Sequence, residues 1–269
     1  MTGTTTDRLY RLLVRQVADD GVATGHGEQT PVTEADLAGL PDVVRRYLRF
    51  MGTVGRPRVW SFRANIAGKF RLRPRLGWMP AQAWQYNSSL EVARVFVMRL
   101  RLAHVLTMIG RDTYEQGHGH MLGTLFDRIT VVDGRGEEFD IGELTTYLND
   151  AILLAPSMLL GTATSWRAVD DNSFEVSLTD AGHTVTGRVY VDGRGAPYDF
   201  STTDRFADLP GGLVRAEWRT PVRDWTAIDG RAAPTRFEAV WHLPHGPMPY
   251  FTGELTHLAH NVSPTNPHM

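Results

Sequence analysis

The sequence contains no cysteine, which excludes disulfides, iron–sulfur clusters, thiolate metal sites and cysteine nucleophiles. Lysine is nearly absent too, since of 28 basic residues only Lys69 is a lysine and the others are arginines. A Schiff-base mechanism would therefore depend on Lys69 alone. Long apolar runs are also missing, because the longest, residues 151–160, is interrupted by Pro156 and is too short to cross a bilayer.

Targeting and cofactor motifs are missing as well. No apolar segment follows a basic stretch at the N-terminus, so we expect no secretory signal and a cytoplasmic protein. The sequence has no G-x-G-x-x-G after a strand, no Walker loop, no G-x-S-x-G and no H-E-x-x-H. The formal net charge of −2 gives no sign of nucleic-acid binding. We therefore expect no organic cofactor, no nucleic-acid partner and no integral membrane segment.

Three segments have the apolar spacing of helices: residues 7–19, 41–50 and 142–154. A polar, glycine-containing linker over residues 21–33 follows the first of them. A proline suits the first position of the second helix, and another proline ends the third.

Strands account for most of the remaining sequence. Residues 60–70 alternate most clearly, because the even positions are mostly apolar and the odd positions mostly polar. Glycine, aspartate and asparagine clusters separate the later candidates. The other predicted strands are residues 83–90, 92–102, 105–109, 111–116, 128–132, 165–169, 173–179, 184–191, 198–206, 213–220, 235–243 and 251–260.

This order of elements, without regular βαβ alternation, predicts an α+β fold with a large antiparallel sheet and helices packed on one face. A sheet of about ten strands usually curls. We therefore expect a half-barrel wrapped around helices with an apolar cavity, the default place for a ligand. The predicted organisation is an N-terminal helix and linker, residues 1–33, followed by a single curved-sheet domain, residues 34–269.

Glu143, Tyr147 and Asp150 are the candidates for acid–base chemistry. Their spacing of i, i+4 and i+7 places them on one side of the third predicted helix. Two carboxylates and a phenol that face a cavity could transfer protons if burial shifts their pKa values. The alternative is a solvent-exposed helix face with Tyr147 half buried.

Two groups of histidines are further candidates. His242 ends a predicted strand beside a proline-rich turn and could act as a proton carrier at the cavity rim, or as a hydrogen-bonded structural residue. His118 and His120 would share one side of a strand, and Asp112 or Glu115 could supply a third metal ligand. Because glycines flank both histidines, a turn is the favoured interpretation, and we expect no metal.

Aromatic and soft apolar side chains are candidates for the lining of the cavity. Core packing is the alternative for each of them, and the sequence does not separate the two. The candidate substrate-binding residues are Trp78, Trp84, Tyr86, Phe96, Met98 and Trp241.

Several motifs have a familiar pattern. Residues 40–49 spell LPDVVRRYLR, residues 55–59 GRPRV, residues 133–144 DGRGEEFDIGEL and residues 241–244 WHLP. Together the motifs resemble a bacterial family of uncharacterised proteins, common in actinobacteria, over about residues 39–258. The resemblance implies a fold similar to the lipoprotein-carrier half-barrel, in which a curled sheet around helices holds acyl chains. It implies no agreed activity.

Two functions fit this pattern. The first hypothesis is an enzyme without an organic cofactor, a cyclase, isomerase or hydrolase of a hydrophobic intermediate such as a polyketide or terpenoid. A cavity that folds a flexible substrate would lower the entropic part of the barrier. The alternative is a non-catalytic carrier or sensor of a lipid-like ligand. The enzyme requires a carboxylate or histidine that points into the cavity.

Overall fold

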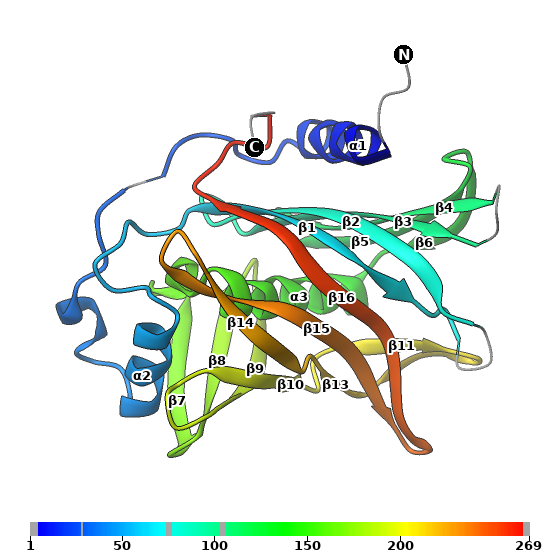
Figure 1. The fold of residues 1–269 in the computed structure, drawn as a ribbon. Helices are drawn as coiled ribbons and strands as arrows, with labels where there is room; N and C mark the ends of the chain where they lie inside the picture. The colour runs from blue at the N-terminus through cyan, green and yellow to red at the C-terminus, as the bar shows by residue number, and fades with distance from the viewer. Residues whose placement is uncertain (1–4, 28, 74–76, 103–105, 266–269) are drawn as a thin grey trace.

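The computed structural model describes residues 5–27, 29–73, 77–102 and 106–265. Its core is an unclosed, antiparallel, 14-stranded sheet that curls around one long helix (Figure 1). The helical elements are α1 (Thr5–Asp19), η1 (Glu34–Leu37), α2 (Asp42–Phe50), α3 (Glu137–Leu154) and η2 (Pro156–Leu159). The predicted α+β class with a curved sheet is confirmed.

Neighbouring strands of the sheet are mostly close in the sequence, and the one pairing between distant segments is that of β1 with β16. The order is β6-β5-β4-β3-β2-β1-β16-β15-β13-β10-β9-β8-β7, and β14 pairs with β15 outside this path. Strands β11 and β12 form a separate two-stranded ribbon. The bounds are β1 (Ser61–Phe70), β2 (Met79–Ser88), β3 (Ala93–Arg101), β4 (Thr107–Glu115), β5 (His118–Leu125), β6 (Ile129–Gly134), β7 (Thr164–Asp170), β8 (Ser173–Asp180), β9 (His183–Val191), β10 (Pro197–Thr202), β11 (Phe206–Leu209), β12 (Gly212–Arg215), β13 (Glu217–Arg219), β14 (Val222–Ile228), β15 (Arg231–Leu243) and β16 (Gly246–His260).

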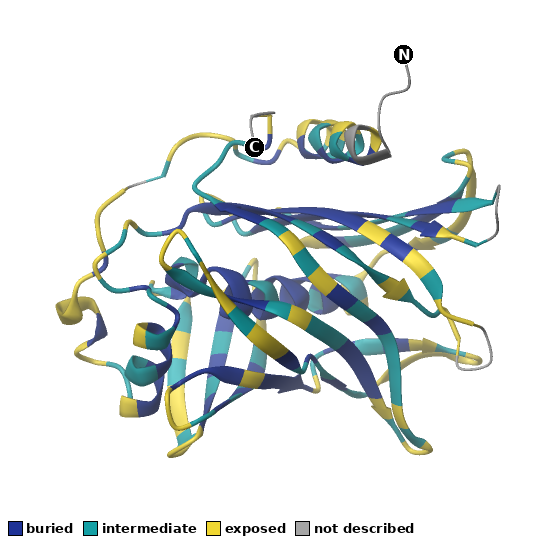
Figure 2. Cartoon of the chain, in the orientation of Figure 1, coloured by how far each residue is buried: buried dark blue, intermediate teal, exposed yellow. Residues whose placement is uncertain are grey.

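Helix α3 lies in the hollow of the sheet and is buried on nearly all sides (Figures 1 and 2). It begins at Glu137, five residues before the predicted start, and the acidic side chains in its first turn favour the positive end of the helix dipole. Tyr47 of α2 donates a hydrogen bond to the carbonyl oxygen of Ile152 at 2.7 Å. This bond ties the small helix α2 to the central one.

Helices lie on both faces of the sheet, so the prediction of one covered face is wrong. Helix α1 packs on the outer, convex face, on the opposite side of the sheet from α3 (Figure 1). Its apolar residues Leu9, Leu13 and Val17 are buried there. The reason is that β2 and β3 carry apolar side chains on the outer face as well, among them Trp84, Tyr86 and Val97, and these side chains also have to be removed from water.

The predicted strands do not include β5 or β14, and they include only the first residue of β11. In β5 the glycines at positions 119 and 123 interrupt the apolar alternation. Gly119 lies against the start of α3, where a Cβ atom would come within 2.1 Å of the carbonyl oxygen of Phe139. The backbone N–H of Gly119 also donates to Asp140 at 2.7 Å. The glycine that hides the strand in the sequence therefore permits its contact with α3.

None of the helices in the described ranges is long and apolar enough to cross a membrane.

Candidate functional site

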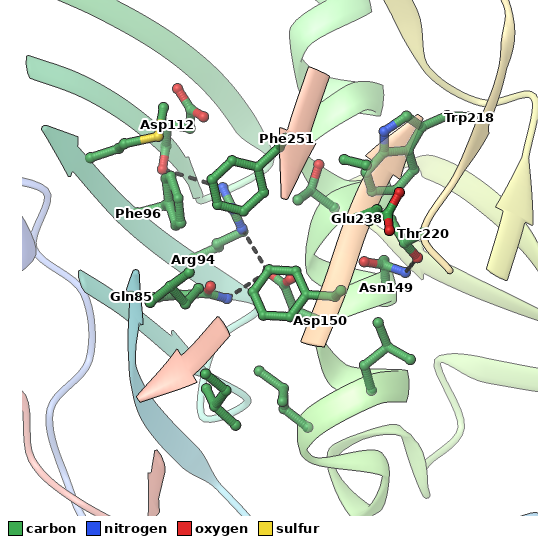
Figure 3. A pocket seen from close by; sticks show the side chains of 18 of the residues that line it. Gln85, Arg94, Phe96, Asp112, Asn149, Asp150, Trp218, Thr220, Glu238 and Phe251 are labelled. Atoms are coloured by element: carbon green, nitrogen blue, oxygen red, sulfur yellow. Dashed lines mark hydrogen bonds and ion pairs between the residues drawn. The ribbon is translucent and has the colours of Figure 1, made fainter. Parts of the chain in front are cut away.

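A cavity lies between α3 and the inner, concave face of the sheet (Figure 3). It contains about 870 Å³ of space not occupied by atoms, part of which is open to solvent. Strands β1, β3, β15 and β16 and the last two turns of α3 supply an apolar wall. Its large members are Ile66, Phe70, Phe96, Met98, Leu153, Leu154, Phe237, Phe251 and Leu255.

One end of the cavity carries a buried network of charges centred on Arg94 of β3. Its Nε lies 2.8 Å from Oδ2 of Asp150, and its Nη1 lies 2.9 Å from Oε2 of Glu143. Gln85 donates a further hydrogen bond to Asp150 at 2.6 Å (Figure 3). Burial opposes the charge on Arg94, but the nearby carboxylates together raise its pKa.

A second arginine, Arg205, joins this network from the segment after β10. Its Nη2 lies 3.6 Å from Oε1 of Glu143, and its Nη1 lies 3.5 Å from the hydroxyl of Tyr250. Its guanidinium carbon lies 4.4 Å from the ring centre of Trp218, within cation–π distance. Glu143 is therefore held between two arginines, deep in the protein.

Asp112 of β4 lines the same end of the cavity. Burial and the neighbouring charge of Glu143 raise its pKa to about 7, against the lowering effect of Arg94 and Arg205. Burial also raises the pKa of Asp150, although Arg94 opposes the shift. Asp112 is therefore a carboxyl group in the cavity that can hold or release a proton near neutral pH.

Replacing Asp112 by asparagine should flatten the pH dependence of stability. The pKa of Asp112 is raised in the folded state, so its contribution is fully present below its unfolded pKa of about 4. That contribution is lost as pH rises towards about 7. Urea denaturation of both proteins over this pH range measures the effect. Parallel profiles for wild type and Asp112→Asn would contradict the shift, and Asp208→Asn is the control for removing an exposed carboxyl group outside the cavity.

The structure separates the three predicted acid–base residues. Asp150 lines the cavity, as expected. Glu143 is buried between Arg94 and Arg205 and is not among the lining residues. Tyr147 is buried but does not line the cavity, and burial raises its pKa above the ordinary value. The alternative of a solvent-exposed helix face is wrong, because all three residues are buried or nearly so.

The predicted histidines lie away from the cavity. His242 is exposed on β15, opposite Glu217, and its position gives no support to a role as proton carrier at the rim. His118 is 82% exposed, and His120 lies 2.7 Å from Asp133. Asp112 of β4 is paired with Met121 of β5, and its side chain points to the inner face of the sheet. His118 and His120 are at the positions of β5 that face the other side, so Asp112 cannot join them in a metal site. Among the described residues, no group of three or more acidic or histidine side chains could hold a metal.

Only two of the six predicted lining residues, Phe96 and Met98, line the cavity. Trp84 and Tyr86 point to the outer face and pack beneath α1. Trp241 is buried nearby and stacks on Tyr250 with 6.1 Å between ring centres, outside the lining set.

Trp78 is 37% exposed and lies under Arg71, whose guanidinium carbon is 4.9 Å from the ring centre. Trp78, Trp84, Tyr86 and Trp241 are therefore packing or surface residues, and their assignment to the cavity lining is corrected.

The sequence analysis did not identify Arg94 and Arg205 as residues of the candidate site. It named Asp112 only as a possible metal ligand. One signal was available for Arg94, which interrupts the apolar run of residues 92–98. A charge within a run that is predicted to be buried requires a partner of opposite charge. The partner lies 49 positions away, in another element, so the sequence did not name it.

A family model matches residues 30–253 of the chain. The chain belongs to DUF6544, a family of unknown function. This agrees with the resemblance to an uncharacterised family, although the match does not test the individual motifs. No curated protein matches the chain.

Solved structures with a similar fold have low sequence identity to this DUF6544 protein. A LolA superfamily protein from Nitrosomonas europaea is 12% identical, with coverage of 80% of this chain and 90% of its own and a TM-score of 0.42. A putative outer membrane lipoprotein-sorting protein domain from Vibrio parahaemolyticus is 10% identical, with coverage of 75% and 85% and a TM-score of 0.41. A beta-barrel-like protein of another domain of unknown function, from Brucella abortus, is 12% identical, with coverage of 76% and 98% and a TM-score of 0.32. These values are too low to transfer a function.

Proposed function

We propose that this DUF6544 protein binds a hydrophobic small molecule that carries one uncharged polar group, in the cavity between α3 and the inner face of the sheet. The observation that carries the proposal is the composition of that cavity. Aromatic and aliphatic side chains form most of its wall, and one group of polar side chains gathers around Arg94 and Asp150. Ligand sites commonly combine a large apolar surface with a few polar groups that fix orientation.

The charges at the polar end favour a neutral partner. Arg94 and Arg205 are matched by Glu143 and Asp150, and Asp112 has a pKa of about 7. A charged ligand group would lose its hydration without finding an unpaired opposite charge. A hydroxyl or carbonyl group would instead exchange water for hydrogen bonds with side chains that are already in place.

Filling the cavity should weaken binding without unfolding the protein. Ala239 of β15 lines the cavity, and the Ala239→Leu variant places three additional carbon atoms in it. We expect affinity for an uncharged apolar fluorescent probe, such as N-phenyl-1-naphthylamine, to fall at least about tenfold, since a displaced apolar contact of ~1.4 kcal/mol has that effect. Fluorescence titration measures the change.

The matched control is Ala227→Leu, on the exposed strand β14 away from the cavity. This variant should bind the probe as the wild type does, and the melting temperatures of both variants should remain close to that of the wild type. Equal probe binding by all three proteins would remove the cavity from consideration as the ligand site. Native mass spectrometry of protein purified from its own host would then identify the natural ligand directly.

A second candidate function is catalysis without an organic cofactor, as a cyclase, isomerase or hydrolase of the same hydrophobic molecule. Asp112 and Asp150 favour it, because both carboxyl groups line the same end of the cavity and burial raises the pKa of Asp112 to about 7. The two functions differ in the fate of the ligand. A carrier releases the molecule unchanged, whereas an enzyme releases it with a changed mass or connectivity, which mass spectrometry and NMR of the released compound distinguish.

A further inference from the structure

A second hollow lies on the outer face of the sheet, beneath the first two turns of α1. It contains about 570 Å³ of atom-free space, part of it open to solvent. We call it the α1 groove. Its lining residues are Arg8, Leu9, Leu12, Arg99, Thr107, Ile109, Phe126 and Asp127. Arg99 alternates with Met98 along β3, so the α1 groove and the cavity lie on opposite faces of the same strand.

Three arginines gather at the α1 groove. Arg99 and Arg101 occupy the same face of β3, and Arg8 approaches them from α1. Burial, and then the charges of Arg101 and Arg8, lower the pKa of Arg99. Like charges that are close enough to perturb one another repel, so this arrangement costs free energy unless an anion is present.

No ion pair joins any of the three to a carboxylate among the side chains that the structure describes, which in α1 begin at Arg8. The acidic residue in the α1 groove, Asp127, is bonded to Arg111 instead. Arg99 donates from Nη2 to the side-chain oxygen of Gln82 at 2.7 Å, but its buried Nε has no acceptor in the described part of the chain. The α1 groove therefore has positive charge and donor capacity to spare.

We propose that the α1 groove binds the phosphate group of a molecule that also has an apolar portion. A phosphate presents several oxygens, which suits planar guanidinium groups arranged around it. The N-terminal end of α1, with its positive dipole, lies over the same place and adds to the attraction. The phosphate can come from a soluble phosphate ester or from a phospholipid headgroup.

The rest of the α1 groove is suited to the apolar portion. Leu9, Leu12 and Ile109 form part of its wall, and Phe126 lies at its edge with 51% of its surface exposed. An aromatic side chain so exposed beside an arginine cluster can contact hydrocarbon while the arginines hold the phosphate. The site is independent of the ligand proposed for the cavity, because no residue lines both hollows.

The test is calorimetric titration of the full chain with inorganic phosphate at low ionic strength, where screening is weak. We expect the Arg8→Gln and Arg99→Gln variants each to bind phosphate at least about tenfold more weakly, since each loses a charge-assisted hydrogen bond. The control is Arg15→Gln, which removes an exposed arginine of the same helix outside the α1 groove. It should leave the affinity unchanged within about twofold. Arg8 is exposed, so its replacement is not expected to impair folding.

A second arm identifies the source of the phosphate. Co-sedimentation with vesicles of phosphatidylglycerol and phosphatidylcholine, compared with phosphatidylcholine alone, tests the lipid headgroup. Binding that requires phosphatidylglycerol and is lost in Arg8→Gln supports a lipid ligand. Binding of inorganic phosphate without binding of vesicles supports a soluble ester. The proposal is overturned if neither probe binds, or if Arg15→Gln reduces binding as much as Arg8→Gln and Arg99→Gln do.

Discussion

Replacing Arg94 by methionine is expected to destabilise the protein by about 3–5 kcal/mol. Methionine retains much of the length of the side chain but leaves Glu143 and Asp150 without their closest positive partner. Glu143 retains Arg205 at 3.6 Å, and Asp150 retains the hydrogen bond from Gln85. These remaining contacts do not replace a guanidinium that bonds both carboxylates in the interior.

Urea denaturation at neutral pH measures this effect. The control is Arg167→Met, which removes one partner of the surface ion pair with Glu175 and should change stability by at most about 1 kcal/mol. Acidic pH should reduce the difference between wild type and Arg94→Met, because protonation removes the uncompensated charges. A loss no larger than that of Arg167→Met would mean that Arg94 does not compensate these carboxylates.

The second large effect concerns Trp84, for which we expect a loss of stability with no loss of ligand affinity. Its side chain is buried beneath α1, with its ring centre 5.0 Å from that of Tyr10 and 5.5 Å from the guanidinium carbon of Arg63. Trp84→Ala leaves a space among Leu9, Leu13 and their neighbours, which should cost about 3–5 kcal/mol. Chemical denaturation measures this loss.

Probe titration of the Trp84→Ala variant completes the experiment. Affinity should be unchanged, because Trp84 lies on the other face of β2 from Gln85, which lines the cavity. Trp78→Ala is the control for removing an indole, since Trp78 is 37% exposed against 8% for Trp84, and its removal should cost clearly less stability than Trp84→Ala. The prediction is contradicted if the Trp84→Ala variant has normal stability but binds the probe more weakly, because Trp84 would then be part of the ligand site.

The alternation of β1 shows what the sequence predicts well. The apolar even positions, among them Phe62 and Ala64, are in the main core as expected. The odd positions are mostly polar, yet Arg63 among them is buried between the rings of Tyr10 and Trp84. A period of two identifies a strand and its two faces, but it does not reveal that α1, from a distant part of the chain, covers the second face.

The candidate site was harder to predict for the same reason. Trp84, Tyr86, Phe96 and Met98 all suited a ligand pocket, and only the last two face it. In β2 and β3 both faces are apolar, so composition does not indicate which face meets the cavity and which meets α1. That distinction depends on the pairing register between strands, which the long-range contacts determine.

The charge network had still less signal in the sequence. Arg94 and Arg205 are two of many arginines, and the acidic residues they hold lie on another element. The predicted i, i+7 spacing of Glu143 and Asp150 did place both carboxylates beside one guanidinium. The spacing thus predicted correctly that the two carboxylates lie close together. It did not predict that Arg94 of β3 binds both of them, and this contact determines what each can do.

The position of β16 has a consequence for the order in which the molecule forms. This strand is inserted between β1 and β15, so the two halves of the sheet become neighbours only when it is in place (Figure 1). During synthesis on the ribosome, one edge of β1 therefore stays without a hydrogen-bonded neighbour until translation has passed His260. Pairings between such distant segments form slowly, and a bare edge attracts other nascent chains. Until β16 is in place, the unpaired edges of β1 and β15 are therefore the parts of the sheet most open to wrong pairing with another chain.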